Sequence, residues 1–167
     1  MIKTGKEHLS QLRDGRVVYI GDEKIDDVTT HPAFEKAAQK VAELYDIKHQ
    51  EIYKDVLSYE ENGELCSTWF LQAKNKSDLR KRSKAHKVIA DQTSGMMGRS
   101  MDHVASFVTG MSTNPDIFDS GKYKFKENLL NYYSFMKKND TFASYAVVPP
   151  QAARNPEFYQ KQNQSLL

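Results

Sequence analysis

The segment GMMGRSMDHVASF, residues 95–107, carries the side chains best suited to chemistry. Arg99 precedes a predicted helix N-cap at Ser100, and His103 lies four residues after Arg99, so both side chains can share one face. Phe107, one turn later, belongs to an apolar stripe. An arginine and a histidine beside such a stripe could hold an anionic oxygen in an apolar pocket. Spacing alone favours a plainer interpretation about twofold, with Arg99 as a helix-end charge and His103 as a boundary residue.

A second unusual segment, SYAVVPPQAARN, begins at Ser144. A β-prone run up to Val148 leads into two prolines, whose fixed φ makes the following turn rigid. Such a turn can present Gln151 and Arg154 to a ligand, although an ordinary exit from a sheet edge is the alternative. Because a lone strand exposes unpaired backbone groups, we expect a sheet that continues beyond residue 167.

A basic run extends from Lys74 to Lys87 and holds seven Lys or Arg residues and one Asp. It lacks the interleaved aromatic side chains on which nucleic-acid bases stack. The whole chain has 24 Lys plus Arg against 22 Asp plus Glu, a formal net charge of +2. We interpret the run as a solvated helix face or an interdomain surface, with phosphate binding as the weaker alternative, and expect no nucleic-acid partner.

Several other classes of site are not indicated. The sequence has no GxGxxG or GxxxxGK[ST] motif, and its five histidines show no metal-ligand spacing, so no metal is expected. The single cysteine, Cys66, excludes a disulfide within the chain and a cysteine-ligated cluster. No signal peptide is visible, and no apolar run approaches the roughly 18 residues of a membrane span. We expect a soluble, cytoplasmic protein.

Apolar periodicity predicts a mainly helical domain with two small β-hairpins and a C-terminal strand. The predicted cap residues for the longer helices are Thr30, Ser77, Ser100 and Ser120. A short helix is expected over 4–12, and the longer ones over 32–46, 77–97, 101–112 and 121–138. The hairpins are expected near 17–28 and 55–71, the second around Asn62-Gly63. Trp69 and Phe70 are expected in the core.

Long motifs in this chain resemble the 4-hydroxyphenylacetate 3-monooxygenase large-component (oxygenase) family. The resemblance rests on TGKEHLSQLRDGRVVYIGDEKIDDVTTHPAF near the start, GMMGRSMDHVASF in the middle, and SYAVVPPQAAR near the end. These motifs occur in the order and at the spacing of the family pattern. The resemblance covers residues 2 to about 160, nearly the whole chain.

The resemblance implies a particular fold. Members of the family are similar to acyl-CoA dehydrogenases, with an N-terminal helical domain, a middle β-barrel and a C-terminal four-helix bundle. Residues 1–140 would then form the helical N-terminal domain. Residues 141–167 would begin the middle β-barrel domain, truncated here.

The resemblance also implies a reaction. Family members are two-component aromatic monooxygenases that take reduced FAD from a separate flavin reductase and form a flavin C4a-hydroperoxide. They hydroxylate a phenol such as 4-hydroxyphenylacetate beside its hydroxyl group, and some relatives act on halogenated or nitrated phenols. They form dimers or tetramers. Because the flavin site also needs the barrel and the bundle, we expect the 167 residues alone to be inactive.

Five residues acquire roles through the resemblance. The substrate-pocket arginine falls on Arg99, and a pocket aromatic or histidine falls on His103. Tyr145 stands where the family has the histidine of its TH motif. Since tyrosine does not take up a proton near pH 7, His103 would assume the imidazole's role. Gln151 and Arg154 match the PQ-x-x-R segment that touches FAD.

Two alternatives stay open. The chain could be a truncated, non-catalytic binding or structural module of the same fold. It could also be a relative of 4-hydroxybutyryl-CoA dehydratase, a branch that places cysteine ligands for an iron-sulfur cluster in this domain. With Cys66 as the only cysteine, that branch is disfavoured.

Overall fold

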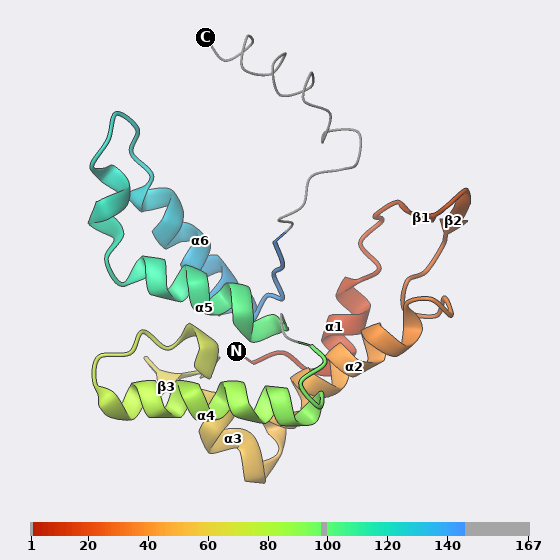
Figure 1. The fold of residues 1–167 in the computed structure, drawn as a ribbon, viewed down its shortest axis with the longest axis horizontal. Coiled ribbons are helices and arrows are strands. Elements are labelled where there is room, and N and C mark those ends of the chain that lie inside the picture. The colour runs from red at the N-terminus through yellow and green to blue at the C-terminus, as the bar shows by residue number, and fades with distance from the viewer. Residues whose placement is uncertain (1, 98–99, 146–167) are drawn as a thin grey trace.

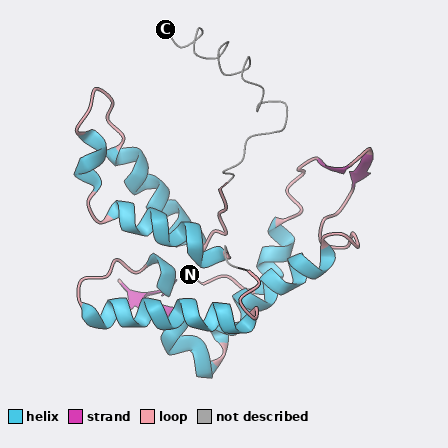
Figure 2. Cartoon of the chain, viewed as in Figure 1, coloured by secondary structure: helices cyan, strands magenta, loops and turns pink. Residues whose placement is uncertain are grey.

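A computed structural model describes residues 2–97 and 100–145 of the chain (Figure 1). Helices dominate and the strands form two separate hairpins, which confirms a mainly helical fold (Figure 2). The α-helices are α1 Gly5–Gln11, α2 Glu35–Asp46, α3 Glu51–Leu57, α4 Lys76–Gln92, α5 Met101–Ser112 and α6 Lys126–Asn139. Short 3-10 helices are η1 Ile47–His49, η2 Thr68–Phe70 and η3 Pro115–Asp119, and the strands are β1 Val18–Ile20, β2 Glu23–Ile25, β3 Ser58–Glu61 and β4 Glu64–Ser67.

Helix α1 begins at a capping box. The Thr4 hydroxyl accepts a hydrogen bond from the Glu7 amide, and the Glu7 carboxylate accepts one from the Thr4 amide. The helix then packs against α2. A Cβ on Gly5 would lie 2.5 Å from the carbonyl oxygen of Ala42, so this close approach requires glycine. Together with the β1–β2 hairpin, α1 and α2 form an arm on one side of the molecule (Figure 1).

Both predicted hairpins are present. In β1–β2, Val18 lies opposite Ile25, and in β3–β4, Ser58 lies opposite Ser67. The second hairpin is shorter than predicted, since α3 occupies residues 51–57 and η2 follows β4. The prediction missed α3, whose Tyr53, Val56 and Leu57 meet the core at helical spacing.

Several helix boundaries differ from the predictions, three of them in α2 and α4. Helix α2 starts at Glu35 instead of 32, because the Asp27 carbonyl accepts from Thr30 and His31 amides and holds the preceding residues in turns. Helix α4 is capped by Asn75 instead of Ser77. It ends at Gln92 instead of 97, because Ser94 and Gly95 have positive φ.

The last helix begins later than predicted. Residues after Asn114 form η3 and a turn, so α6 starts at Lys126 instead of 121, and its first amide donates to Asp119. Ser120 does not cap α6. Phe125 and Tyr132 are about half exposed, whereas Tyr133 and Met136 are buried. Of the predicted C-terminal strand, only Ser144 and Tyr145 lie within the described residues, and both are irregular.

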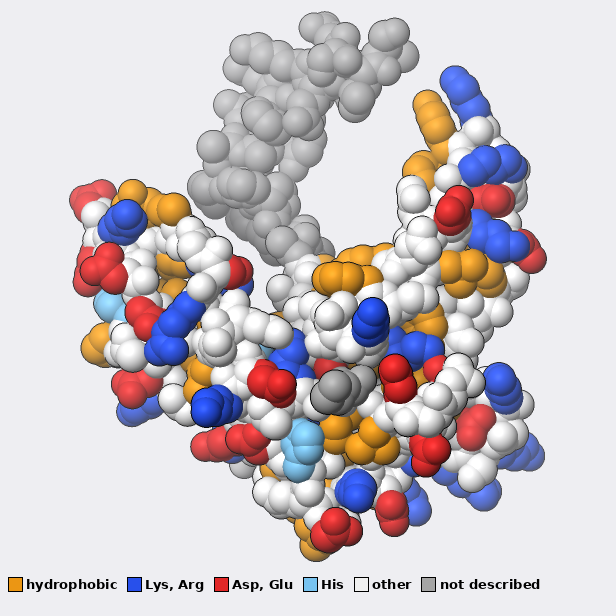
Figure 3. Space-filling view, turned by 180° about the vertical axis from the view of Figure 1, so that it is seen from behind, with side chains coloured by type: hydrophobic (Ala, Val, Ile, Leu, Met, Phe, Trp, Pro, Cys, Tyr) orange, Lys and Arg blue, Asp and Glu red, His pale blue; other side chains and the backbone are white. Residues whose placement is uncertain are grey.

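The core lies between α2 and the helices that follow it. Trp69 and Phe70 of η2 are fully buried there, as predicted, and η2 contacts both α4 and α5. Their carbonyl oxygens accept hydrogen bonds from Thr109 at 3.0 Å and from Tyr133 at 2.7 Å, so η2 links α5 to α6. On the face in Figure 3, acidic and basic side chains are interspersed.

A buried polar cluster fixes the end of α6. Asp140 has a left-handed φ of 45° and accepts hydrogen bonds from the ammonium of Lys48 and from the Ser67 hydroxyl. The backbone amide of Lys3 donates to the same carboxylate at 2.9 Å, and the Tyr45 hydroxyl donates to the Asp140 carbonyl. Segments far apart in the sequence therefore meet at one carboxylate.

Candidate active site

The side chains at the start of α5 make a polar group at the edge of the core. Ser100 occupies the N-cap position, but its hydroxyl donates to the Asp102 carboxylate and accepts no hydrogen bond from a backbone amide of the helix. The other oxygen of Asp102 lies 2.5 Å from Nδ1 of His86, which belongs to α4. His86 in turn has its Nε2 3.3 Å from the Ser106 hydroxyl. Residues from α4 and α5 are thus joined by a chain of polar contacts.

Asp102 is the ionised residue in this series of polar contacts. Burial raises its pKa, but the hydrogen bonds from His86 and Ser100 outweigh burial, and the pKa falls below its usual value. A carboxylate can only accept hydrogen bonds, so Nδ1 of His86 must carry the proton that they share. The orientation of the imidazole is fixed accordingly, with Nε2 toward Ser106.

His103 and Tyr145 lie together although 42 residues separate them. Nε2 of His103 is 3.3 Å from the Tyr145 hydroxyl, and the two rings are stacked with centroids 5.6 Å apart. Phe107 meets His103 edge-on at 4.9 Å. Phe107 is half exposed, so the three rings form an open aromatic wall instead of a part of the core.

A cavity of about 550 Å³ adjoins this wall, within the range of small-molecule sites. Of the methionines in the 95–107 segment, Met97 lines the cavity, whereas Met96 is exposed to solvent. The lining residues are His86, Ile89, Ala90, Gly95, Met97, Ser100, Asp102, His103, Ser106 and Phe107. The cavity therefore combines apolar walls with a few convergent polar groups.

The structure describes only two of the five predicted site residues. It brings His103 and Tyr145 together, whereas Arg99, Gln151 and Arg154 lie outside the described residues. Sequence reasoning missed His86 and Asp102. Asp102 stands inside the 95–107 motif, but His86 was hidden in the basic run, and no spacing rule connects residues on two different helices.

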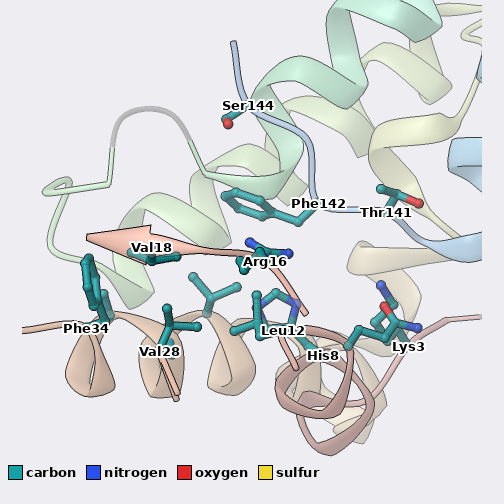
Figure 4. A pocket seen from close by; sticks show the side chains of 14 residues that line it. Lys3, His8, Leu12, Arg16, Val18, Val28, Phe34, Thr141, Phe142 and Ser144 are labelled. Atoms are coloured by element: carbon teal, nitrogen blue, oxygen red, sulfur yellow. The ribbon is translucent and has the colours of Figure 1, made fainter. Parts of the chain in front are cut away.

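A second cavity, of about 580 Å³, lies between α1, α2, β1 and the segment after α6 (Figure 4). Its polar lining includes Lys3, His8 and Arg16, and its walls include Phe34 and Phe142. Burial and the charges of nearby basic residues lower the pKa of His8 to about 4. Neither His103 nor Tyr145, the described residues proposed for chemistry, lines this cavity, so we place the candidate active site at the first one.

Two absences hold for residues 2–97 and 100–145, the part of the chain that the structure describes. Among them, no group of three His, Cys, Asp or Glu side chains is arranged to hold a metal ion. None of the described helices is both long and apolar enough to cross a membrane.

Comparison with known proteins decides the family. The family model described as 4-hydroxyphenylacetate 3-hydroxylase N terminal matches residues 4–167. The chain belongs to this family. The oxygenase component of 4-hydroxyphenylacetate 3-monooxygenase from Thermus thermophilus is 39% identical over 156 residues, 92% of this chain and 31% of that protein. The oxygenase component of 4-nitrophenol 2-monooxygenase from a Rhodococcus species is 36% identical over 155 residues, 91% of this chain and 29% of that protein.

Solved structures agree with the family assignment. The oxygenase component of 4-hydroxyphenylacetate 3-monooxygenase, complexed with FAD and 4-hydroxyphenylacetate, matches with a TM-score of 0.83 and 37% identity over 93% of this chain and 32% of that one. A 4-hydroxybutyryl-CoA dehydratase from N. maritimus matches with a TM-score of 0.69 at 18% identity, covering 85% of this chain and 28% of that one, which shows a common fold alone. The chain spans about a third of the length of the curated relatives it matches.

Proposed function

We propose that this chain is the N-terminal domain, residues 1–140 with the start of a β-barrel domain, of a two-component aromatic monooxygenase. The complete enzyme would use reduced FAD to hydroxylate a phenol beside its hydroxyl group. One observation carries the proposal: His103, which lines a cavity large enough for a phenol, contacts Tyr145. Membership of the family, and the FAD and 4-hydroxyphenylacetate bound by a similar protein, support it.

The residues would divide the work on the substrate. The guanidinium of Arg99 would stabilise the phenolate and lower the pKa of the phenol, which makes the ring carbon beside the oxygen more nucleophilic. His103 would accept the phenol proton, and Tyr145 would orient it through their shared contact. The family's TH-motif position holds tyrosine here, but the imidazole is supplied from position 103, 3.3 Å away.

The flavin would be held in part by Gln151 and Arg154, which match the family's FAD-touching segment. When bound, reduced FAD supplies the activated oxygen, while the protein binds and orients the phenol. Phe107 and Met97 would shield the reacting atoms from water. A flavin reductase as partner, a homo-oligomeric state and a cytoplasmic location belong to the same proposal. On their own, residues 1–167 are expected to be inactive and to form no stable flavin complex.

Arg99→Ala in the full-length oxygenase tests the proposal. Reaction with reduced FAD, oxygen and a phenol should still consume oxygen, but mainly as hydrogen peroxide. Removing one charge-stabilising donor should lower the ratio of hydroxylated product to peroxide about a hundredfold. Arg99→Lys should restore part of that ratio, because lysine keeps the charge but loses the planar fork.

Arg80→Ala is the matched control, since Arg80 is an exposed arginine on α4. It should leave the product-to-peroxide ratio unchanged. If Arg99→Ala hydroxylates as efficiently as the unmodified enzyme, Arg99 is only a helix-end charge and the proposed pocket chemistry is wrong.

A further inference from the structure

The His86–Asp102 pair lies where the core meets the candidate cavity. The side chain of Asp102 is only 11% exposed, whereas that of His86 is 39% exposed, and both line the cavity. The pair thus anchors a half-open imidazole to a nearly buried carboxylate. Neither residue is needed to close the core, whose members near the pair are Ala85, Ile89, Met101 and Ala105.

The contact between Ser100 and Asp102 forms at the expense of a helix-capping hydrogen bond. A serine at an N-cap normally accepts a hydrogen bond from the second or third amide of its helix, which stabilises the helix. Here the hydroxyl donates to Asp102 instead, so both carboxylate oxygens have partners. Asp102 itself is in the first turn of α5, where the helix dipole favours a negative charge. The hydroxyl of Ser100 therefore holds the Asp102 carboxylate toward His86, and α5 lacks the capping hydrogen bond that this hydroxyl could have accepted.

His86 contacts α5 at two successive turns. Nδ1 meets Asp102, and Nε2 meets Ser106 four residues later, so these contacts lie along one face of the helix. His103 lies between them in the sequence, and its backbone amide donates to the carbonyl of Ser100 at 3.1 Å. Two contacts on one face restrict rotation of the helix about its axis. A rotation of α5 would move the His103 imidazole away from the Tyr145 hydroxyl.

We propose that His86 and Asp102 are positioning residues for phenol hydroxylation, which fix the rotation of α5 so that His103 faces Tyr145 and the substrate. This inference rests on the proposed function. It assigns no proton transfer to His86, whose role is exercised through Asp102. Because His86 and Asp102 act on the placement of His103 and are not proposed to contact the phenol, the effect falls on turnover.

Two substitutions of His86 separate this role from others. The side-chain amide of asparagine places a donor near the position of Nδ1, whereas that of glutamine reaches the position of Nε2. His86→Asn should therefore keep the bond to Asp102, and His86→Gln should lose it. The assay uses the full-length oxygenase with reduced FAD, oxygen and 4-hydroxyphenylacetate or 4-nitrophenol, and measures kcat, KM and the product-to-peroxide ratio.

We expect His86→Gln and Asp102→Asn to lower kcat and the product-to-peroxide ratio about tenfold, with KM changed less than about twofold. His86→Asn should restore most of the loss. The control is Asp91→Asn, which removes the exposed Lys87–Asp91 pair of the same helix and should change nothing. Thermal unfolding of each variant checks folding. Should Asp102→Asn not fold, the two variants of the more exposed His86 carry the test.

The outcomes are distinct. Unchanged kcat and product ratio in His86→Gln overturn the inference while the proposed function stands. Equal losses in His86→Asn and His86→Gln also overturn it, because the bond to Asp102 would then not be what matters. If the unmodified enzyme hydroxylates neither phenol, whereas its reduced FAD is consumed, the proposed function fails and this inference fails with it.

Discussion

Two carboxylates in this molecule each pair with a basic side chain, one in the core and the other at a cavity. Lys48–Asp140 and His86–Asp102 each lie at the end of a helix, and in each the carboxylate also accepts a hydrogen bond from a serine hydroxyl. The side chains of Lys48 and Asp140 are 0% and 2% exposed, whereas His86 faces a cavity. The same interaction therefore joins segments in one place and lines a pocket in the other.

The difference teaches what burial does to an ion pair. The ammonium of Lys48 lies 4.2 Å from the Tyr45 ring centroid and 4.9 Å from that of Trp69, so no substrate can reach it. The Lys48–Asp140 pair therefore contributes only to the stability of the fold. Loss of one partner leaves an unpaired charge in the core. The half-open pair costs less desolvation and can be approached by a ligand. The two pairs thus differ in exposure as well as in their basic residue, which is a buried lysine in the structural pair and a partly exposed histidine in the pair near the chemistry.

The largest expected effect comes from neutralising the buried pair. Asp140→Asn keeps the shape and tolerates the left-handed backbone, which asparagine favours, but leaves Lys48 without its counter-charge. Burial already lowers the pKa of Lys48 to about 8 against the pull of Asp140. We expect the free energy of unfolding to fall by about 3 kcal/mol, measured by urea denaturation followed by circular dichroism.

Asp116→Asn provides the control for this change, because it breaks the solvent-exposed pair with Lys126. That loss should be below about 1 kcal/mol. Similar stability losses for the two variants would show that burial does not distinguish the pairs as argued.

The next effect concerns the aromatic wall. His103→Ala should lower the product-to-peroxide ratio about tenfold, less than Arg99→Ala, because Tyr145 shares the substrate hydrogen bond. Exchanging the two residues, as His103→Tyr with Tyr145→His, moves the imidazole back to the family's position. If the pair acts as a unit, the double variant should hydroxylate better than either single variant. A double variant no better than the worse single one would argue against a shared role.

The sequence predicted those parts of the fold that depend on local pattern. Apolar spacing placed α5 within the predicted bounds, and Asn62-Gly63, both with positive φ, formed the turn of the second hairpin. The predicted helix boundaries were wrong where an unexpected side chain determines the helix end. Asn75, for example, caps α4 ahead of Ser77. Residue type correctly located Ser100 at a helix start, but could not show that its hydroxyl turns to Asp102.

The candidate site was predictable only in part. His103 was predicted from helical spacing and from a family motif, and Tyr145 from a family motif alone, whereas their contact depends on the path of the chain after α6. The partners of Asp102 and Asp140 lie on other elements, 16 and 92 residues away, so no local pattern reveals them. Spacing can propose which side chains share a face, whereas pairs between helices follow from packing.

The smallest predicted effect concerns the second cavity. His8 stacks on Tyr45 with centroids 4.9 Å apart, and burial, followed by the charges of Lys3 and Lys48, lowers its pKa from 6.5 to about 4. Between these pH values the unfolded chain binds a proton that the folded chain does not. Stability should therefore decrease as pH falls from about 6.5 to 4. Because His8 borders a cavity that water can enter, we expect the free energy of unfolding to fall by about 1 kcal/mol over this pH range.

His8→Phe isolates this contribution. Phenylalanine keeps the ring beside Tyr45 but has no proton to bind, so its unfolding free energy should depend less on pH over the same window. Urea denaturation at several pH values measures the difference between the two profiles, and carboxylates that titrate in this range cancel in it. Parallel profiles would mean that His8 is as easily protonated in the folded protein as in the unfolded chain. Burial of His8 and the charges of Lys3 and Lys48 would then have too small an effect on its pKa to distinguish this cavity from ordinary surface.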